Sequence, residues 1–147
     1  MVETDAVVMW ERLVRYQRAT LQVMDASLRA AFGHSLDDYD VLHQVTLCGE
    51  PMRMGRLAES LLVANSSCTR IVGRLVESGH LDRRRGLADR RAVLVGITAE
   101  GRRLHRRMAA HHTRDIRRLF GARLSPGAQS GLEHALAELL APQPPPE

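Results

Sequence analysis

The residues best suited to chemistry in this sequence are arginines, and they are concentrated in one stretch of the chain. All 21 basic residues are arginine, and residues 70–118 contain 14 of them against 5 acidic residues, although the net charge of the whole chain is only +4. A planar guanidinium binds phosphate groups and guanine edges through paired hydrogen bonds, and a local cationic field attracts polyanions. Charge alone fits a solvated arginine face equally well. The stretch therefore indicates either a nucleic-acid interface or a charged solvated surface.

Several reactive chemistries are excluded by what the chain lacks. Without any lysine, it has neither a P-loop lysine nor a Schiff-base lysine. It also has no G-x-S-x-G motif, no H-E-x-x-H motif and no glycine-rich phosphate loop, which are signatures of common hydrolases and nucleotide-binding enzymes. We therefore expect a protein that is not an enzyme and that carries no cofactor.

The two cysteines and the N-terminal segment bear on the compartment. Cys48 and Cys68 have no CxxC spacing and are too few for a disulfide framework, which favours a reducing environment. Charged residues interrupt the first 30 positions every few residues, so neither a signal peptide nor a membrane span is expected there. We expect a cytoplasmic protein without a membrane partner.

Length and composition predict one compact, mostly α-helical domain. The 147 residues are 44% hydrophobic but only 3% aromatic, so the core is built from aliphatic side chains, which favours helices. Residues 7–32 contain no glycine or proline and have apolar residues at helical spacing on two opposite sides. Such a helix fits a subunit interface on one face and its own domain on the other.

The remaining elements are marked by caps and by periodicity. Ser35, Thr98 and Ser125 each stand where a helix N-cap is expected. Two short helices joined by a few residues form the helix-turn-helix arrangement, and the hairpin that follows them makes a wing. The expected elements are helices at residues 36–47, 55–62, 66–78, 99–120 and from 126 onward, an extended piece at 52–54, strands at 80–84 and 92–97, and a disordered proline-rich tail at 142–147.

The second helix of this pair has a small, cationic outer face. At 100° per residue, its outward positions are Ser66, Thr69, Arg70, Gly73, Arg74 and Glu77. Gly73 costs a helix roughly 1 kcal/mol relative to alanine, which is explained if this face lies flat against a partner, or if the glycine relieves packing. The hairpin that follows has five arginines at or near its tip: Arg83, Arg84, Arg85, Arg90 and Arg91.

Together these residues resemble the multiple-antibiotic-resistance regulator (MarR) family of bacterial transcription factors. The matching segments are YDVLHQV, RLAESLLV, SSCTRIVGRLVESGHLDR and DRRAVLVGITAEGRRL, in the family's order and spacing. The resemblance implies an interlocked homodimer of six-helix subunits. Residues 1–34 and 100–141 would supply its dimerisation helices, and residues 35–99 its winged helix-turn-helix.

The resemblance also implies the DNA contacts. Ser66, Ser67, Thr69 and Arg70 occupy positions at which the family contacts bases and nearby phosphates. Arg74 occupies a position nearer the DNA backbone. One departure is Ala64, which stands where many members have a Ser or Thr cap, so that Asn65 or Ser66 is left as the cap of the recognition helix.

Asp89 and Arg91 match the family's wing Asp-x-Arg motif, and Arg90 lies between them at the hairpin tip. The family pattern implies that Arg91 enters the minor groove and that Asp89 orients it. A guanidinium suits a narrow, electronegative minor groove, whereas a carboxylate at the tip would repel phosphate. An ordinary surface ion pair is the alternative interpretation of this pair.

Many family members bind small aromatic acids between the DNA-binding lobe and the dimerisation helices. Side chains here that could line such a cleft are aromatic or imidazole groups, although most aromatic residues at helical spacing belong to a core. The candidates are Trp10, Tyr16, Tyr39, His43 and His112.

For His112, a structural role beside Asp115 is the favoured alternative to ligand contact. Zinc needs three or four convergent ligands, and Met108 stands where a helical partner of His112 would lie. Neither cysteine lies in the first helix, where the family's peroxide sensors carry theirs. We therefore expect no metal site.

The sequence as a whole predicts a homodimeric regulator, most often a repressor in this family, that binds a pseudo-palindromic site in double-stranded DNA. A small aromatic effector is expected to release it. The alternatives are a winged-helix module for protein association and a metal- or redox-responsive regulator.

Overall fold

The computed structural model describes residues 5–61 and 65–142, and at positions 65 and 66 it describes the backbone only. Ala64 and most of the proline-rich tail, residues 143–147, lie outside the described residues. The described elements, in order, are α1 (Ala6–Phe32), α2 (Leu36–Cys48), β1 (Met52–Arg53), α3 (Met54–Ser60), α4 (Asn65–Glu77), β2 (Leu81–Arg85), β3 (Val93–Ile97), α5 (Ala99–Leu119), the 3-10 turn η1 (Gly121–Arg123) and α6 (Pro126–Leu140).

This order confirms the predicted mostly-α fold with a small β wing. The short extended piece expected at 52–54 is a strand, β1, and it pairs with the hairpin to give a sheet of order β1-β3-β2. Within the described residues, no helix is long and apolar enough to cross a membrane. The chain divides into two compact units, Met1–His112 and Thr113–Glu147, which we describe separately.

The helix ends follow from local sequence. Gly33 closes α1 in the left-handed conformation, with φ of 71°, a region that glycine adopts without steric cost. Ser35 and Asp38 form a reciprocal capping box at the start of α2. Thr98 Oγ1 accepts the Gly101 N–H at 3.0 Å, as expected of an N-cap. The predicted caps at Ser35 and Thr98 are therefore confirmed.

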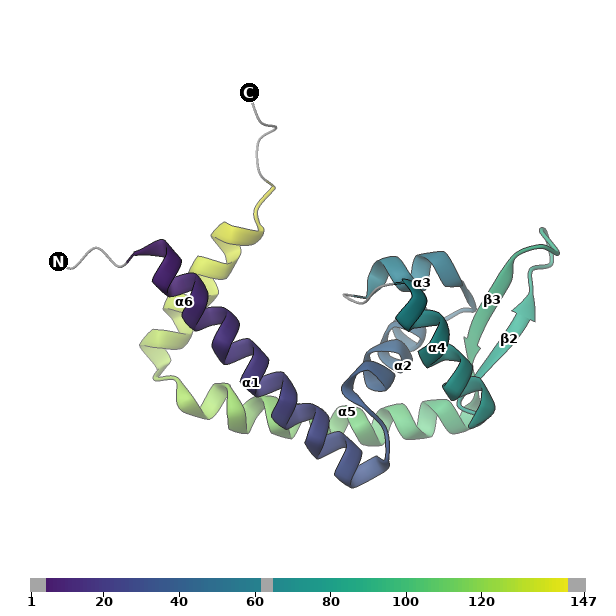
Figure 1. Cartoon of the computed structure of the whole chain (residues 1–147), viewed down its shortest axis with the longest axis horizontal. Helices are drawn as coiled ribbons and strands as arrows, with labels where there is room; N and C mark the ends of the chain where they lie inside the picture. Colours follow the sequence, from purple (N-terminus) through teal and green to yellow (C-terminus); the bar gives the residue numbers. More distant parts are fainter. Residues whose placement is uncertain (1–4, 62–64, 143–147) are drawn as a thin grey trace. The chain divides into compact units, whose positions relative to one another are not determined.

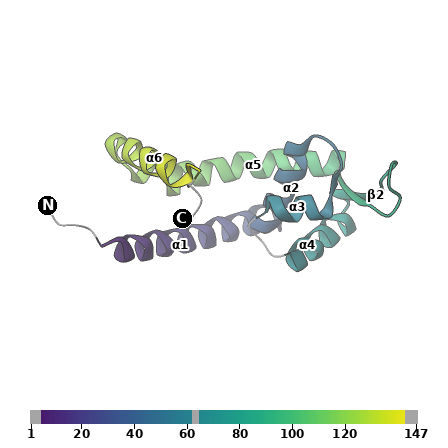
Figure 2. The ribbon, with the colours of Figure 1, turned by 90° about the horizontal axis from the view of Figure 1, so that it is seen from above.

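The core of the first unit lies among α2, α3, α4 and the sheet. Figures 1 and 2 show α3 and α4 side by side, with the wing extending past them. The inward residues of α3 and α4 match the pattern expected of a helix-turn-helix. Together with residues of α2 and the sheet, they form a core that is mostly aliphatic: Leu42, Leu57, Cys68, Ile71, Val72, Leu75, Leu81 and Val95. The helix pair and the wing base therefore share one hydrophobic core.

The long helix α1 is mostly uncovered within its own unit. Only Met24 and Leu28 are buried in it, whereas Trp10 is 65% exposed and Val7 is 62% exposed. A row of large apolar side chains in water is unfavourable, and it marks a protein contact surface.

The second unit has the same property on a smaller scale. Ser125 Oγ accepts the Ala128 N–H and Pro126 occupies the first helical position, so the predicted start of α6 is confirmed. No described residue of α6 is buried, and Leu139 and Leu140 are 68% and 82% exposed. Both ends of the chain therefore present apolar helix faces.

Gly101, in the first turn of α5, is buried against the segment that follows α4. A Cβ at this position would lie 1.9 Å from the carbonyl oxygen of His80 and 2.8 Å from Ile97 Cγ1. The same His80 oxygen accepts hydrogen bonds from both the N–H and the hydroxyl of Thr98. Glycine thus allows α5 to start in direct contact with the helix-turn-helix.

We expect Gly101→Ala to destabilise the fold by about 3 kcal/mol, because the clash is with backbone and cannot be relieved by a rotamer change. Thermal unfolding followed by circular dichroism measures the effect. Gly55→Ala is the matched control, since an added Cβ there meets nothing within 4 Å. Equal melting temperatures for the two variants would contradict the packing described.

Candidate nucleic-acid interface

Helix α4, the predicted recognition helix, presents polar and cationic residues on the side away from the core. Cys68 and Ile71 face inward and are buried, whereas Thr69 and Arg70 are exposed and Ser67 is half-buried. The side chain of Ser66 lies outside the described residues. The structure therefore leaves Thr69 and Arg70 accessible to a macromolecular partner, as their predicted role requires.

Arg74 is placed differently from its neighbours on that helix. Its Nη2 donates to Oδ1 of Asp38, at the start of α2, at 2.7 Å. The Asp38 side chain is 8% exposed and that of Arg74 is 47% exposed. Arg74 therefore links α4 to α2, a contact that the sequence pattern did not indicate.

The wing tip is ordered by hydrogen bonds of its own. Gly86 N–H donates to Ala92 O at 3.0 Å, and Ala92 N–H donates to Asp89 O at 3.0 Å. Asp89 Oδ1 accepts the backbone N–H of Arg91 at 3.0 Å, and Asp89 Oδ2 lies 3.9 Å from Nη2 of Arg53. Asp89 therefore fixes the backbone that carries Arg91.

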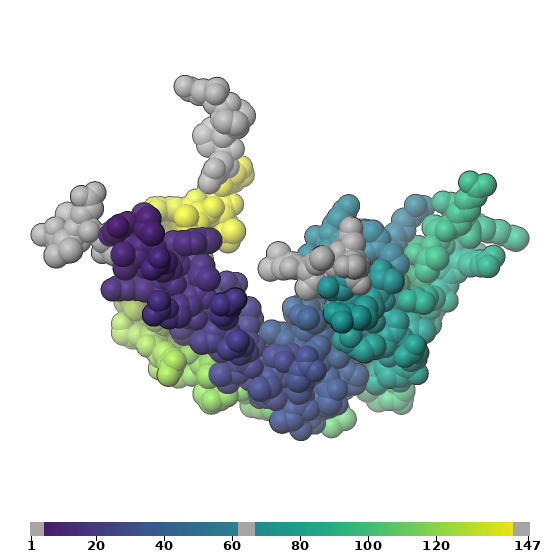
Figure 3. All heavy atoms as spheres, in the orientation of Figure 1, coloured from purple at the N-terminus to yellow at the C-terminus, as the bar shows by residue number. Residues whose placement is uncertain are grey.

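The arginines of the tip are open to solvent. Arg90 and Arg91 are both exposed, at the end of a hairpin that projects beyond the helices of its unit (Figure 3). A projecting hairpin with cationic side chains and an ordered backbone has the shape and charge to enter a nucleic-acid groove.

Residues 46–93, which include both α4 and the wing tip, match the family model described as MarR family. Over these residues the winged helix-turn-helix is similar to the MarR family. No curated protein matches the chain by sequence.

Solved structures similar to the whole chain carry the same assignment. AbsC of Streptomyces coelicolor, a MarR family transcriptional regulator, is 24% identical, with a TM-score of 0.81 over 95% of this chain and 94% of AbsC. Sco3205 of the same organism, solved in complex with DNA, is 23% identical, with a TM-score of 0.80 over 97% of this chain and 92% of Sco3205. BpsR of Bordetella bronchiseptica, whose DNA binding is regulated by 6-hydroxynicotinic acid, is 17% identical, with a TM-score of 0.78 over 97% of this chain and 98% of BpsR. At these identities the likeness shows the fold.

In the MarR fold of this chain, the predicted effector residues separate into two places. Tyr39 stacks on His43 with centroids 5.5 Å apart and lies 4.8 Å from His112. Trp10, by contrast, is exposed on α1 and lines a shallow hollow with Glu11, Val14, Arg15 and Arg18. Tyr16, also on α1, is 36% exposed. The described ring contacts therefore bring together three of the five candidates.

A fourth ring, His105 of α5, joins this ring cluster, which we define as Tyr39, His43, His105 and His112. His43 Nδ1 and His105 Nε2 are 3.1 Å apart, and His105 stacks on Tyr39 with centroids 5.8 Å apart. His105 is not among the effector residues predicted from the sequence. Its spacing of seven residues from His112 places both on one side of α5, and that spacing is the signal that was missed.

The electrostatics of the ring cluster disfavour a second proton. Burial, together with neighbouring His43 and Arg106, lowers the pKa of His105. Two imidazoles that share one hydrogen bond accommodate a single bridging proton, so protonation of both would place like charges in contact. The ring cluster therefore favours the neutral form of His105.

Two observations on the described residues bear on the metal alternative and on redox chemistry at Cys68. Among the described residues, no group of three or more His, Cys, Asp or Glu side chains is placed to hold a metal ion. Burial raises the pKa of the Cys68 thiol, which disfavours the thiolate that reacts with peroxide.

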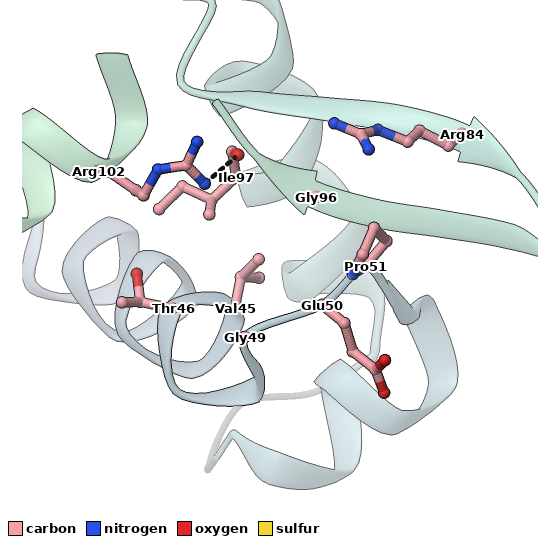
Figure 4. Close-up of a pocket in the computed structure, with 9 residues that line it drawn as sticks. All are labelled: Val45, Thr46, Gly49, Glu50, Pro51, Arg84, Gly96, Ile97 and Arg102. Carbon is pink, nitrogen blue, oxygen red and sulfur yellow. Dashed lines mark hydrogen bonds between the residues drawn. The ribbon is translucent and has the colours of Figure 1, made fainter. Parts of the chain in front are cut away.

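A separate hollow lies at the base of the wing. Its volume is about 360 Å³, and Figure 4 shows Arg84 and Arg102 above it and the end of α2 below. Both guanidiniums already have partners within the unit: Arg84 binds Asp82 through two hydrogen bonds, and Arg102 donates to Ile97 O. The partner of Arg84 lies two residues away in the same strand, whereas Arg102 links the start of α5 to the end of β3.

The lowered pKa of His105 gives a pH prediction. Because the folded protein holds this imidazole neutral, protonation favours the unfolded chain, and stability is lost as pH falls below about 6.5, the ordinary histidine pKa. His80, whose pKa is also lowered by burial, acts in the same direction. Melting temperatures at pH 7.5 and 5.5 should differ less in His105→Gln than in the unsubstituted protein. An unchanged pH dependence would show that His105 is not one of the groups responsible, and His134→Gln, at an exposed position, is the control.

Proposed function

We propose that the protein is a homodimeric, sequence-specific regulator that grips double-stranded DNA with α4 in the major groove and the wing tip in the adjacent minor groove. The class, a DNA-binding transcriptional regulator, follows from the family assignment. The docking mode is supported chiefly by one observation: Thr69 and Arg70 on α4, and Arg90 and Arg91 on the ordered wing tip, are all exposed in one unit. An exposed arginine on a recognition helix suits guanine edges, and one on a wing suits a narrow minor groove.

The proposed homodimer is supported by the uncovered apolar faces. Trp10 and Leu13 on α1 and Leu139 and Leu140 on α6 are exposed, and a second copy of the chain would bury them. Two symmetry-related lobes then meet two half-sites about one helical turn apart, which makes the operator pseudo-palindromic. We place the dimer in the cytoplasm, where bacterial DNA is found, and expect it to act as a repressor.

The proposed effector is a small aromatic acid bound near the ring cluster. Tyr39 and the imidazoles around it offer flat faces with polar edges, the lining that a flat polar ligand needs. BpsR, with the same fold, has its DNA binding regulated by a hydroxylated aromatic acid. Displacement of α2 against α5 by such a ligand would move the DNA-binding elements that α2 supports.

We expect Arg70→Ala to weaken operator binding by about 1–3 kcal/mol and to relax base preference within the major-groove half-site. Arg91→Ala should instead lose preference at A/T-rich positions flanking it, because the minor groove is narrow there. Selection of bound fragments from genomic DNA, followed by gel-shift titration, measures both. Arg123→Ala, which removes a cation from the other unit, should bind as the unsubstituted protein does. Unchanged affinity and base preference in both interface variants would refute the docking mode.

The salt dependence of binding distinguishes a DNA-binding regulator from the alternative, a winged-helix module for protein association. DNA binding through several phosphate contacts falls steeply with salt, by about 10³–10⁵ between 50 and 200 mM. Binding that is insensitive to salt would favour the association module.

We expect Leu139→Glu to shift the protein from dimer to monomer, since a carboxylate would be buried against apolar side chains of the second copy. Sedimentation velocity over a concentration series measures the change. Glu59→Gln on α3, outside the proposed interface, is the control. A Leu139→Glu protein that sediments as the unsubstituted dimer would place the subunit interface elsewhere.

A further inference from the structure

The charge of Arg74 is matched inside the protein. Its partner, Asp38, is buried and also accepts the Ser35 N–H at 3.0 Å and lies 3.3 Å from His34 Nδ1. Burial alone would raise the pKa of this carboxyl, but the Ser35 N–H, Arg74 and His34 together hold it below its ordinary value. Withdrawing Arg74 to bind a phosphate would leave a buried carboxylate poorly compensated, which is costly.

A different guanidinium lies over the outer face of α4. Arg83, on β2, reaches back across the helix so that its Nη2 is 3.8 Å from the position that a Cβ of Gly73 would occupy. Gly73 is three residues after Arg70 and directly before Arg74, so Arg83 adds its charge to the surface that carries the predicted base contacts. The side chain of Arg83 is exposed.

The geometry at Gly73 also bears on why a glycine is there. A contact of 3.8 Å is an ordinary van der Waals distance, so alanine would fit against Arg83. Packing within the unit therefore does not explain why a glycine, which destabilises a helix interior relative to alanine, stands here. An outer surface that must be approached closely by a partner does explain it.

The ion pairs of the described residues distinguish Arg83 from its neighbours. Arg84, the next residue of the strand, is held by Asp82 at 2.8 Å, and Arg74 is held by Asp38 at 2.7 Å. In the described part of the chain, no carboxylate forms an ion pair with Arg83 or Arg70. A cation without an internal partner is the one whose charge is available to DNA phosphate.

We propose that Arg74 is a positioning residue that fixes α4 to α2 through Asp38, and that Arg83, laid over Gly73, is the phosphate-binding cation of this part of the interface. This proposal rests on the proposed function. It reassigns the backbone contact that family position gives to Arg74.

Salt dependence of DNA binding tests the reassignment, because each phosphate contact adds about 0.9 to the slope of log affinity against log salt concentration. Operator affinity is measured by fluorescence anisotropy from about 50 to 300 mM salt for the full chain and for Arg83→Gln, Arg74→Gln and Arg84→Gln. We expect Arg83→Gln to reduce the slope by about 1 with little change in melting temperature. Arg84→Gln, the matched control from the same strand, should leave the slope unchanged.

The result expected for Arg74→Gln is the opposite one. It should lower the melting temperature and weaken binding by a similar factor at every salt concentration, with an unchanged slope. Arg74→Lys, which can keep the ion pair with Asp38, should restore part of the melting temperature and part of the DNA affinity. In a double-mutant cycle on melting temperature, Asp38→Asn and Arg74→Gln should be strongly non-additive.

The outcomes separate this proposal from the proposed function. A reduced slope in Arg74→Gln, or an unchanged slope in Arg83→Gln, would overturn the reassignment while leaving DNA binding intact. An Arg74→Gln chain that fails to fold supports the positioning role, and Arg83→Gln then decides the phosphate contact alone. If the unsubstituted protein showed no salt-dependent DNA binding, the proposed function itself would fail.

Discussion

The buried carboxylate of Asp38 is the point on which the arrangement of the DNA-binding unit depends. One oxygen completes the capping box of α2 through the Ser35 N–H, and the other accepts Arg74 of the recognition helix. A charge in this position is tolerated only while its partners remain in place. Together with the shared hydrophobic core, this side chain fixes the separation between the start of α2 and the middle of α4. Because α4 carries the exposed Thr69 and Arg70, that separation also sets where these residues meet a partner.

The arginines of the proposed interface divide into those that pair with a carboxylate and those that have no such partner among the described residues. Arg53, Arg74 and Arg84 lie against carboxylates, whereas no ion pair of the described residues involves Arg70 on α4 or Arg91 at the wing tip. This division explains why the strong local excess of positive charge is compatible with a folded unit. Part of the charge is neutralised at short range, and repulsion among the rest is reduced by spacing along a helix and a hairpin.

Elements fixed by local patterns could be predicted from the sequence, whereas side-chain partnerships across elements could not. The capping box at Ser35, the proline start at Pro126 and the hairpin wing each depend on a few adjacent residues, and the structure confirms them. The pairing of Arg74 with Asp38 joins residues 36 positions apart. Periodicity shows only that Arg74 faces outward from its own helix, and it carries no information about which neighbouring element lies there. For the same reason the sequence predicted Trp10 in one group with Tyr39, His43 and His112, although the structure places it apart from the ring cluster. Helical spacing does not show how residues of α1 lie relative to those of α5.

Base recognition by a single lobe is too weak for a regulator, and this energetic limit connects the exposed apolar helices to the interface. A good bidentate contact discriminates between bases by about 1–3 kcal/mol, and α4 has one exposed arginine that forms no ion pair among the described residues, Arg70. Specific regulators separate their site from other DNA by about 4–10 kcal/mol. Two lobes held at a fixed spacing double the number of contacts without a second loss of translational freedom. In the proposed homodimer, the apolar residues of α1 and α6 are therefore as necessary to specificity as the arginines proposed to face the DNA.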